Sequence, residues 1–158
     1  MAMAVTTFVG QNAGARKPDR IHKGLLQGLF ISWGISACII TGLYIFAPYI
    51  AELFNQDTAV VGFAVLFLRL NSLFDPVNAT NQIEAGALRG VGDSRTPMII
   101  MLMSFVVFRQ IYLFIISRLT VSVYFIAVGY PLGWIVCTAL MTLHKKRSGW
   151  DKKIEALR

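Results

Sequence analysis

The sequence predicts an all-α integral membrane protein with four complete transmembrane helices. The stretches Gly24–Ala51 and Leu119–Leu143 contain no Asp, Glu, Lys, Arg or His, and each is longer than the roughly 20 residues that cross a hydrocarbon core. The composition agrees, because the 158 residues are 56% hydrophobic and only 15% charged, with a mean hydropathy of +0.61. Soluble domains are closer to a quarter charged. These observations exclude an ordinary soluble protein.

The apolar segments and the polar turns between them place the elements in order. We expect residues 1–9 to be the end of a truncated helix, because so short a segment covers only about 13 Å as a helix. Short polar or basic turns separate the later apolar stretches. Residues 144–158 are expected to form a basic cytoplasmic tail. The predicted transmembrane helices are residues 24–51, 58–88, 97–117 and 120–143.

The basic residues predict how the chain is threaded through the membrane. Residues 16–23 carry four Lys or Arg and residues 144–158 carry six, whereas residues 52–57 carry none. Because basic loops face the cytoplasm, we expect residues 10–23, residues 89–95 and the C-terminus on the cytoplasmic side of a multi-pass protein of the plasma (cell inner) membrane. The net charge of +7 therefore belongs to loops at the lipid surface, and no nucleic acid partner is expected.

A polar stripe in the second predicted span marks a candidate pathway for ions or substrate. Polar residues inside a membrane face a bundle interior or a water-filled cavity. Pro76 adds a predicted bend beside a carboxylate, and transporters use such discontinuities for ion sites. The stripe follows helical spacing on one face, and its members are Asn71, Asp75, Asn78 and Gln82, continued by Arg89.

Asp75 is the central residue of this prediction, and two roles stay open for it. With the neighbouring amides it offers oxygens for Na⁺ or a site for H⁺, so Na⁺ or H⁺ is expected as the coupling ion, with no other cofactor. The alternative is a structural ion pair with Arg109, because both residues lie about 20 Å from the predicted cytoplasmic ends of their helices. Asp75 and Arg109 are expected to pair or to share a water-filled cavity, so Arg109 is also a pathway candidate. Glu84 lies on the opposite face near the helix end; we interpret it chiefly as structural and keep it as a pathway candidate.

Two motifs resemble the paired signatures of the multidrug and toxic compound extrusion (MATE) transporters. They are TFVGQNAGARKPDR at Thr7–Arg20 and ALRGVGDSRTPMI at Ala87–Ile99. The resemblance implies a twelve-helix, two-lobe transporter, of which residues 1–158 would be a partial C-terminal lobe with helices nine to twelve. The motif residues in this sequence are Gly10, Gln11, Asn12, Gly14, Arg89, Gly90, Gly92, Asp93, Arg95 and Pro97.

The motifs also have a physical interpretation that does not depend on the resemblance. Their glycines are expected to form tight turns or adopt positive φ. The pairs Gly10–Gly14 and Gly86–Gly90 also have the spacing that lets helices approach closely. Asp93 is predicted to cap the helix that follows it. The motif arginines are predicted to anchor the turn at lipid head groups.

The resemblance implies secondary active efflux of drugs or organic cations by Na⁺ or H⁺ antiport, with this chain as the C-terminal part. The expected partners are a small amphipathic or cationic substrate, the lipid bilayer, and the missing N-terminal lobe or a second chain. One alternative is a lipid-linked oligosaccharide flippase of the same superfamily, which is disfavoured because only Arg69 and Arg109 are basic within the spans. Another is a non-transporting four-helix accessory or oligomerising protein. The sequence shows no nucleophile–base pair, metal cluster or phosphate loop, so an enzyme is not expected.

Overall fold

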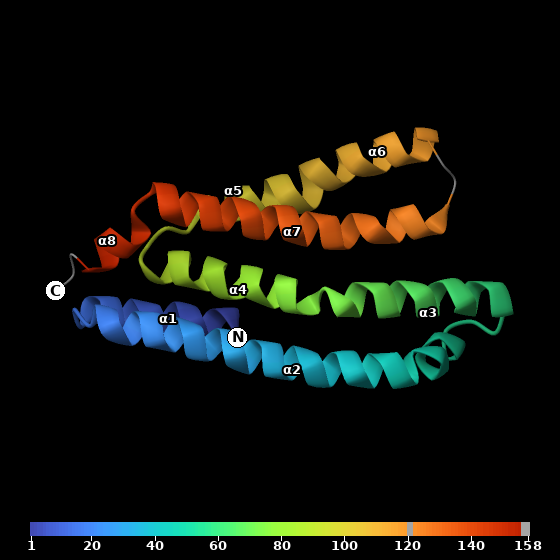
Figure 1. The fold of residues 1–158 in the computed structure, drawn as a ribbon, viewed down its shortest axis with the longest axis horizontal. Coiled ribbons are helices and arrows are strands. Elements are labelled where there is room, and N and C mark those ends of the chain that lie inside the picture. The colour runs from blue at the N-terminus through green and yellow to red at the C-terminus, as the bar shows by residue number, and fades with distance from the viewer. Residues whose placement is uncertain (120–121, 156–158) are drawn as a thin grey trace.

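The computed structural model describes residues 1–119 and 122–155, and the elements in that part of the chain are helical (Figure 1). Figure 1 shows three layers: α1 with α2, then α3 with α4, then α5 and α6 with α7. The middle pair contacts both outer layers. The elements are α1 (Ala2–Gly14), α2 (Pro18–Glu52), α3 (Thr58–Leu73), α4 (Asp75–Gly90), α5 (Arg95–Leu102), the π-helical segment η1 (Met103–Phe108), α6 (Arg109–Leu119), α7 (Val123–Arg147) and α8 (Trp150–Glu155).

Within the described residues, three helical stretches are long and apolar enough to cross a membrane, namely α2, the continuous stretch Arg95–Leu119 and α7. Helices α3 and α4 pass the same test only as a pair, which is bent by 48° at the break between them. Counted as one span, this pair completes the four predicted crossings. The described part of the chain therefore confirms the predicted all-α membrane fold class.

The second span is not the single bent helix 58–88 that the sequence predicts. Helix α3 ends at Leu73, Phe74 has φ −98° and ψ 3°, and α4 begins at Asp75 with Pro76 as its second residue. Proline has no N–H and its ring clashes with the carbonyl one turn back, which kinks or breaks a helix. The expected bend is a complete break, and the polar stripe is divided between two helices.

The first motif is helical, and the loop predicted for residues 10–23 is wrong. Helix α1 continues to Gly14 and Pro18 opens α2, so residues 15–17 alone join the two helices. The positive φ of this turn, 54°, falls on Arg16 and not on a glycine. Of the predicted loop residues, α1 contains Gly10, Gln11, Asn12 and Gly14.

Close packing between α1 and α4 explains why the glycines lie inside helices. A Cβ added to Gly90 would lie 2.6 Å from the Val9 Cβ, and one added to Gly86 would lie 2.8 Å from the Ala2 carbonyl oxygen. Gly10 faces the same seam, since its Cβ would lie 3.4 Å from the Gly90 carbonyl oxygen. Because glycine has no side chain, the backbones of α1 and α4 can approach this closely. The small-residue spacing therefore marks a real helix contact.

The other boundaries shift by a few residues. The third span is Arg95–Leu119, where residues 97–117 were expected, and it includes η1. The fourth span begins at Val123 and continues to Arg147, so the predicted tail starts inside a helix; cations are favourable in the last turn of a helix. Residues 120–121, at the expected start of this span, and residues 156–158 lie outside the described residues.

The basic segments gather at one end of the molecule. Figure 1 shows the α1–α2 turn, the α4–α5 turn and α8 at the same end, and the α2–α3 turn at the other. Gly149 has a φ of 61°, a left-handed conformation that lets the chain turn from α7 into α8. Basic and non-basic turns therefore lie at opposite ends of the molecule, as the charge pattern predicts.

Candidate ion and substrate pathway

Asp75 is the first residue of α4 and lies at the break in the middle of the α3–α4 pair. Its Oδ2 accepts a hydrogen bond of 2.8 Å from the Ser36 Oγ on α2. The carboxylate is half-buried, while Ser36 is only 3% exposed. Because Asp75 is 15 residues before Gly90 and 17 after Thr58, it lies about 22–26 Å along the pair from either end. A carboxylate is therefore held near the middle of the α3–α4 pair, facing α2.

A cavity of about 360 Å³ opens beside this carboxylate. The Gln82 side chain, two turns along α4, faces the same space, as does Ser32, one turn along α2 from Ser36. The Ser32 Oγ is buried with no hydrogen-bond partner among the described residues. The cavity thus combines one carboxylate with neutral polar groups on an apolar wall. It is lined by Met1, Ala2, Ser32, Ile35, Ser36, Ile39, Asp75, Ala79 and Gln82.

A smaller cavity of about 190 Å³ borders the other side of the break and is also lined by Asp75. Asn71, the last stripe residue on α3, lines it. The Asn71 amide donates a 2.9 Å hydrogen bond to the Phe67 carbonyl oxygen, while its Oδ1 is buried without a partner in the described part of the chain. Asn78 is half-buried and lines neither cavity. Of the four stripe residues on α3 and in the first two turns of α4, the structure therefore places three, Asn71, Asp75 and Gln82, on the two cavities that adjoin the break.

The predicted pair between Asp75 and Arg109 is not present among the described residues. The Arg109 guanidinium carbon lies 3.5 Å from the centre of the Tyr130 ring on α7, a cation–π contact. Asp75 instead faces α2 through its bond to Ser36. The prediction was wrong because it assumed that equal depth implies adjacency, whereas α7 and the α3–α4 pair lie between α6 and α2 (Figure 1).

Glu84 faces α7, on the side of α4 away from Ser36. Its Oε1 lies 3.6 Å from the Lys145 Nζ and accepts a long hydrogen bond of 3.5 Å from the Thr142 Oγ1. The Glu84 side chain is 13% exposed. Glu84 therefore links α4 to the basic end of α7, and it does not line the cavities beside Asp75.

Asn81, which the sequence reasoning missed, is the fully buried polar residue between α4 and α7. Its Nδ2 donates a 3.1 Å hydrogen bond to the Trp134 carbonyl oxygen, and its Oδ1 accepts a 2.7 Å bond from the Thr138 Oγ1. The available signal was its spacing of three residues from Glu84, which places both on one helix face. Asn81 and Glu84 together form a polar contact along the α4–α7 seam.

Asn81→Ala is expected to lower the free energy of unfolding by about 2 kcal/mol, because it removes two buried hydrogen bonds and leaves the Thr138 hydroxyl less satisfied. The measurement is denaturant unfolding of the purified protein in micelles. The double variant Asn81→Ala/Thr138→Val should lose less stability than the sum of the losses in the two single variants. Asn12→Ala, at a half-buried site with a solvent-exposed bond inside its own helix, is the control. Additive losses, or equal losses in both alanine variants, would contradict this role.

The second motif forms the turn between α4 and α5. The Thr96 N–H donates a 3.0 Å hydrogen bond to the Asp93 Oδ1, which confirms the predicted cap, and Gly92 has the expected positive φ of 90°. The Asp93 Oδ2 also lies 3.8 Å from the His144 Nε2. Arg89 Nη2 lies 3.8 Å from the Met101 Sδ. The remaining motif residues are Gly90 at the end of α4 and Arg95 and Pro97 in α5.

The chain matches known proteins along most of its length. The family model MatE matches residues 1–115. The "Probable multidrug resistance protein NorM" of Mannheimia succiniciproducens is 30% identical over 153 residues, which are 95% of this chain and 28% of that protein. The "Multidrug resistance protein PmpM" of Pseudomonas aeruginosa is 30% identical over 105 residues, which are 66% of this chain and 22% of that protein. The chain thus spans about a quarter of the length of these curated relatives.

Solved structures give the same fold. An inward-facing conformation of a multidrug resistance MATE family transporter of the MOP superfamily superposes with a TM-score of 0.83 at 20% sequence identity. The match covers 99% of this chain and 35% of that structure. An outward-facing conformation superposes with a TM-score of 0.82 at 21% identity. The two solved structures show the fold of this chain, and the family model matches its sequence. The chain therefore belongs to the MatE family of membrane transporters, as its two motifs predict.

Proposed function

We propose that the chain is part of a transporter that exports amphipathic or cationic compounds in exchange for Na⁺ or H⁺. The observation that carries the proposal is the Asp75 carboxylate, held at mid-membrane depth at a helix break and open to the cavity of about 360 Å³. Intramembrane carboxylates of this kind mark ion and proton pathways, and broken helices near the midplane form transporter sites.

The residues around Asp75 fit a hard cation or a proton. The Asp75 carboxylate, the Ser36 hydroxyl and the Gln82 amide supply oxygen ligands from two helices, and hard cations prefer oxygen. The unpartnered Asn71 Oδ1 adds an acceptor across the break. Neutralising the carboxylate removes the cost of a charge at this depth. On this proposal, ion occupancy changes the angle between α3 and α4 at Phe74 and so couples the ion to substrate release.

We place the basic end of the molecule in the cytoplasm of a plasma-membrane protein. The charge excess at the α1–α2 turn and from the last turn of α7 onward supports this orientation. The chain spans about a quarter of its curated relatives, so a complete pathway requires a further lobe. We propose that this lobe comes from the rest of a longer polypeptide or from a second chain.

The positions of the two intramembrane arginines favour an exporter of cations over a flippase for anionic lipid-linked sugars. Arg69 Nη2 donates a 3.0 Å hydrogen bond to the Tyr44 carbonyl oxygen, and Arg109 stacks on Tyr130. Neither arginine lines the cavity beside Asp75. Within the described residues, Asp75 is therefore the only acidic or basic side chain lining that cavity, and its carboxylate attracts cations.

Ethidium efflux tests the proposal. The chain is expressed together with the further lobe, as part of the longer polypeptide or with the second chain, in cells that lack their own drug exporters. Ethidium fluorescence is then followed after imposing a Na⁺ or a proton gradient. We expect expression to speed efflux under one of the two gradients. Unchanged efflux under both gradients, with the protein shown in the membrane by an antibody against its C-terminal tail, would contradict export. Efflux that needs a second expressed chain would identify the source of the missing lobe.

A further inference from the structure

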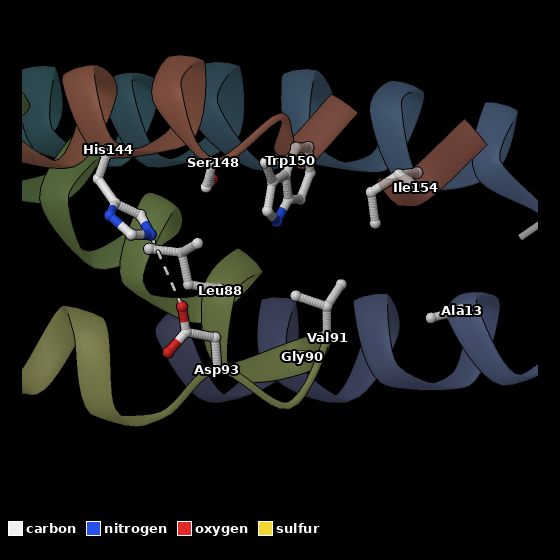
Figure 2. A pocket seen from close by; sticks show the side chains of 9 residues that line it. All are labelled: Ala13, Leu88, Gly90, Val91, Asp93, His144, Ser148, Trp150 and Ile154. Atoms are coloured by element: carbon white, nitrogen blue, oxygen red, sulfur yellow. Dashed lines mark ion pairs between the residues drawn. The ribbon is translucent and has the colours of Figure 1, made fainter. Parts of the chain in front are cut away.

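A third cavity, of about 310 Å³, lies at the basic end of the molecule, where α8 folds over the α4–α5 turn (Figure 2). It is separate from the pathway, because Leu88 in its wall is 13 residues along α4 from Asp75, or about 20 Å. Its volume is at the lower end of the range for small-molecule sites, roughly 300–1,000 Å³. The lining residues are Ala13, Leu88, Gly90, Val91, Asp93, His144, Ser148, Trp150 and Ile154.

The lining of this cavity has an unsatisfied hydrogen-bond donor. Trp150 is only 3% exposed, and its buried Nε1 has no hydrogen-bond partner among the described residues. Figure 2 shows this nitrogen on the edge of the ring that faces the α4 turn across the cavity. A buried tryptophan N–H ordinarily finds an acceptor, and leaving a buried donor unpaired is unfavourable. The donor therefore points to a ligand that carries an acceptor.

Neighbouring side chains fix the Trp150 ring in this position. The His22 ring on α2 packs edge-on against it at 6.0 Å between centroids, and the Lys145 Nζ lies 4.9 Å from its centroid. Ile154, one turn along α8, is 1% exposed and closes the same wall. The donor is thus pre-organised, which lowers the entropic cost of binding a ligand.

The charges at the cavity edge favour a neutral ligand. Asp93 and His144 lie 3.8 Å apart (Figure 2) and form an ion pair when His144 is protonated. The Asp93 Oδ1 is engaged by the Thr96 N–H. An anion would be repelled by this carboxylate, and a cation would have to compete with His144 for it. The rest of the lining is largely apolar.

We propose that this cavity binds a small, neutral, mostly apolar molecule whose carbonyl, ether or hydroxyl oxygen accepts a hydrogen bond from Trp150 Nε1. The site lies outside the proposed export pathway. Its occupant would contact α1, the α4 turn and α8 together, and would hold α8 against the basic end of the bundle.

Quenching of Trp150 fluorescence by 4′-bromoacetophenone tests the proposal. This probe has one carbonyl acceptor, and its bromine quenches indole on contact. The purified chain in micelles carries Trp33→Phe and Trp134→Phe, so that Trp150 is the only tryptophan. We expect saturable quenching. We also expect 4-bromotoluene, which lacks the acceptor, to require about a fivefold or higher concentration, because it leaves the donor unpaired.

Cavity-filling variants separate binding in the cavity from partition into the micelle. Ala13→Leu, on the α1 wall, is expected to raise the half-saturating concentration by about tenfold or more, since added methyl groups occupy the ligand volume. Ala59→Leu, at an exposed position at the other end of the molecule, is expected to leave it unchanged. Val91→Leu fills the cavity from the α4 turn and repeats the test with α1 intact. Linear quenching, quenching insensitive to both filling variants, or equal binding of the two probes would overturn the proposal.

Discussion

Asp75→Asn is expected to reduce ion-coupled ethidium efflux by about tenfold or more, a loss within the usual range of coupling free energies. The amide keeps the shape of the carboxylate and can still accept the 2.8 Å hydrogen bond from Ser36. It removes the charge that attracts a cation and the group that takes up a proton. The folded protein should therefore reach the membrane and lose its response to the driving gradient.

The matched control for this variant is Glu52→Gln. It also neutralises one carboxylate, but at the exposed end of α2, outside the apolar span. Efflux by Glu52→Gln should be close to that of the native protein. If Asp75→Asn retains gradient-dependent efflux, or if both variants lose it equally at equal membrane levels, Asp75 does not couple the ion.

Gly90→Ala is expected to destabilise the fold by about 1–3 kcal/mol through overpacking. The added Cβ would lie 2.6 Å from the Val9 Cβ and 2.9 Å from the Thr6 carbonyl oxygen, so α1 must move away from α4. Backbone atoms cannot give way as a flexible side chain can. The loss is measured as the change in the free energy of unfolding in micelles.

Gly62→Ala is the control, and the expected sign of its effect is opposite. Nothing lies within 4 Å of a Cβ at Gly62, which is exposed on α3. Alanine at position 62 should raise the free energy of unfolding by about 0.5–1 kcal/mol, because glycine loses more conformational freedom than alanine when the helix folds. Equal effects of the two substitutions would show that the α1–α4 contact does not depend on the absent side chain at position 90.

The features that depend on local chemistry could be predicted from the sequence. The uncharged runs predict the spans, and the Asp93 cap and the positive φ of Gly92 follow from turn chemistry. The break beside Pro76 was expected as a bend because proline removes a backbone donor. Each of these predictions uses residues a few positions apart in the chain.

The features that depend on packing between distant segments could not be predicted. Gly10 of the first motif was expected in a loop, because its helical partner, the Gly90 carbonyl of α4, is roughly 80 residues away in the sequence. Arg109 stacks on Tyr130 because α7 packs beside α6. Asn81 is buried by α7 in the same way. Helical spacing shows which residues share a face, and it does not show which helix covers that face.

Thiol labelling of Ala79→Cys is the most direct test of the central claim, which is that the cavity beside Asp75 is a water-filled pathway. Ala79 lines that cavity, one turn from Asp75. In a Cys38→Ser background, we predict that this cysteine reacts with a polar, membrane-impermeant thiol reagent, and that ethidium slows the reaction. Ile45→Cys, on the exposed apolar face of α2, should stay unreactive in lipid. If Ala79→Cys is as unreactive as Ile45→Cys, the cavity is closed to water and the proposed pathway is wrong.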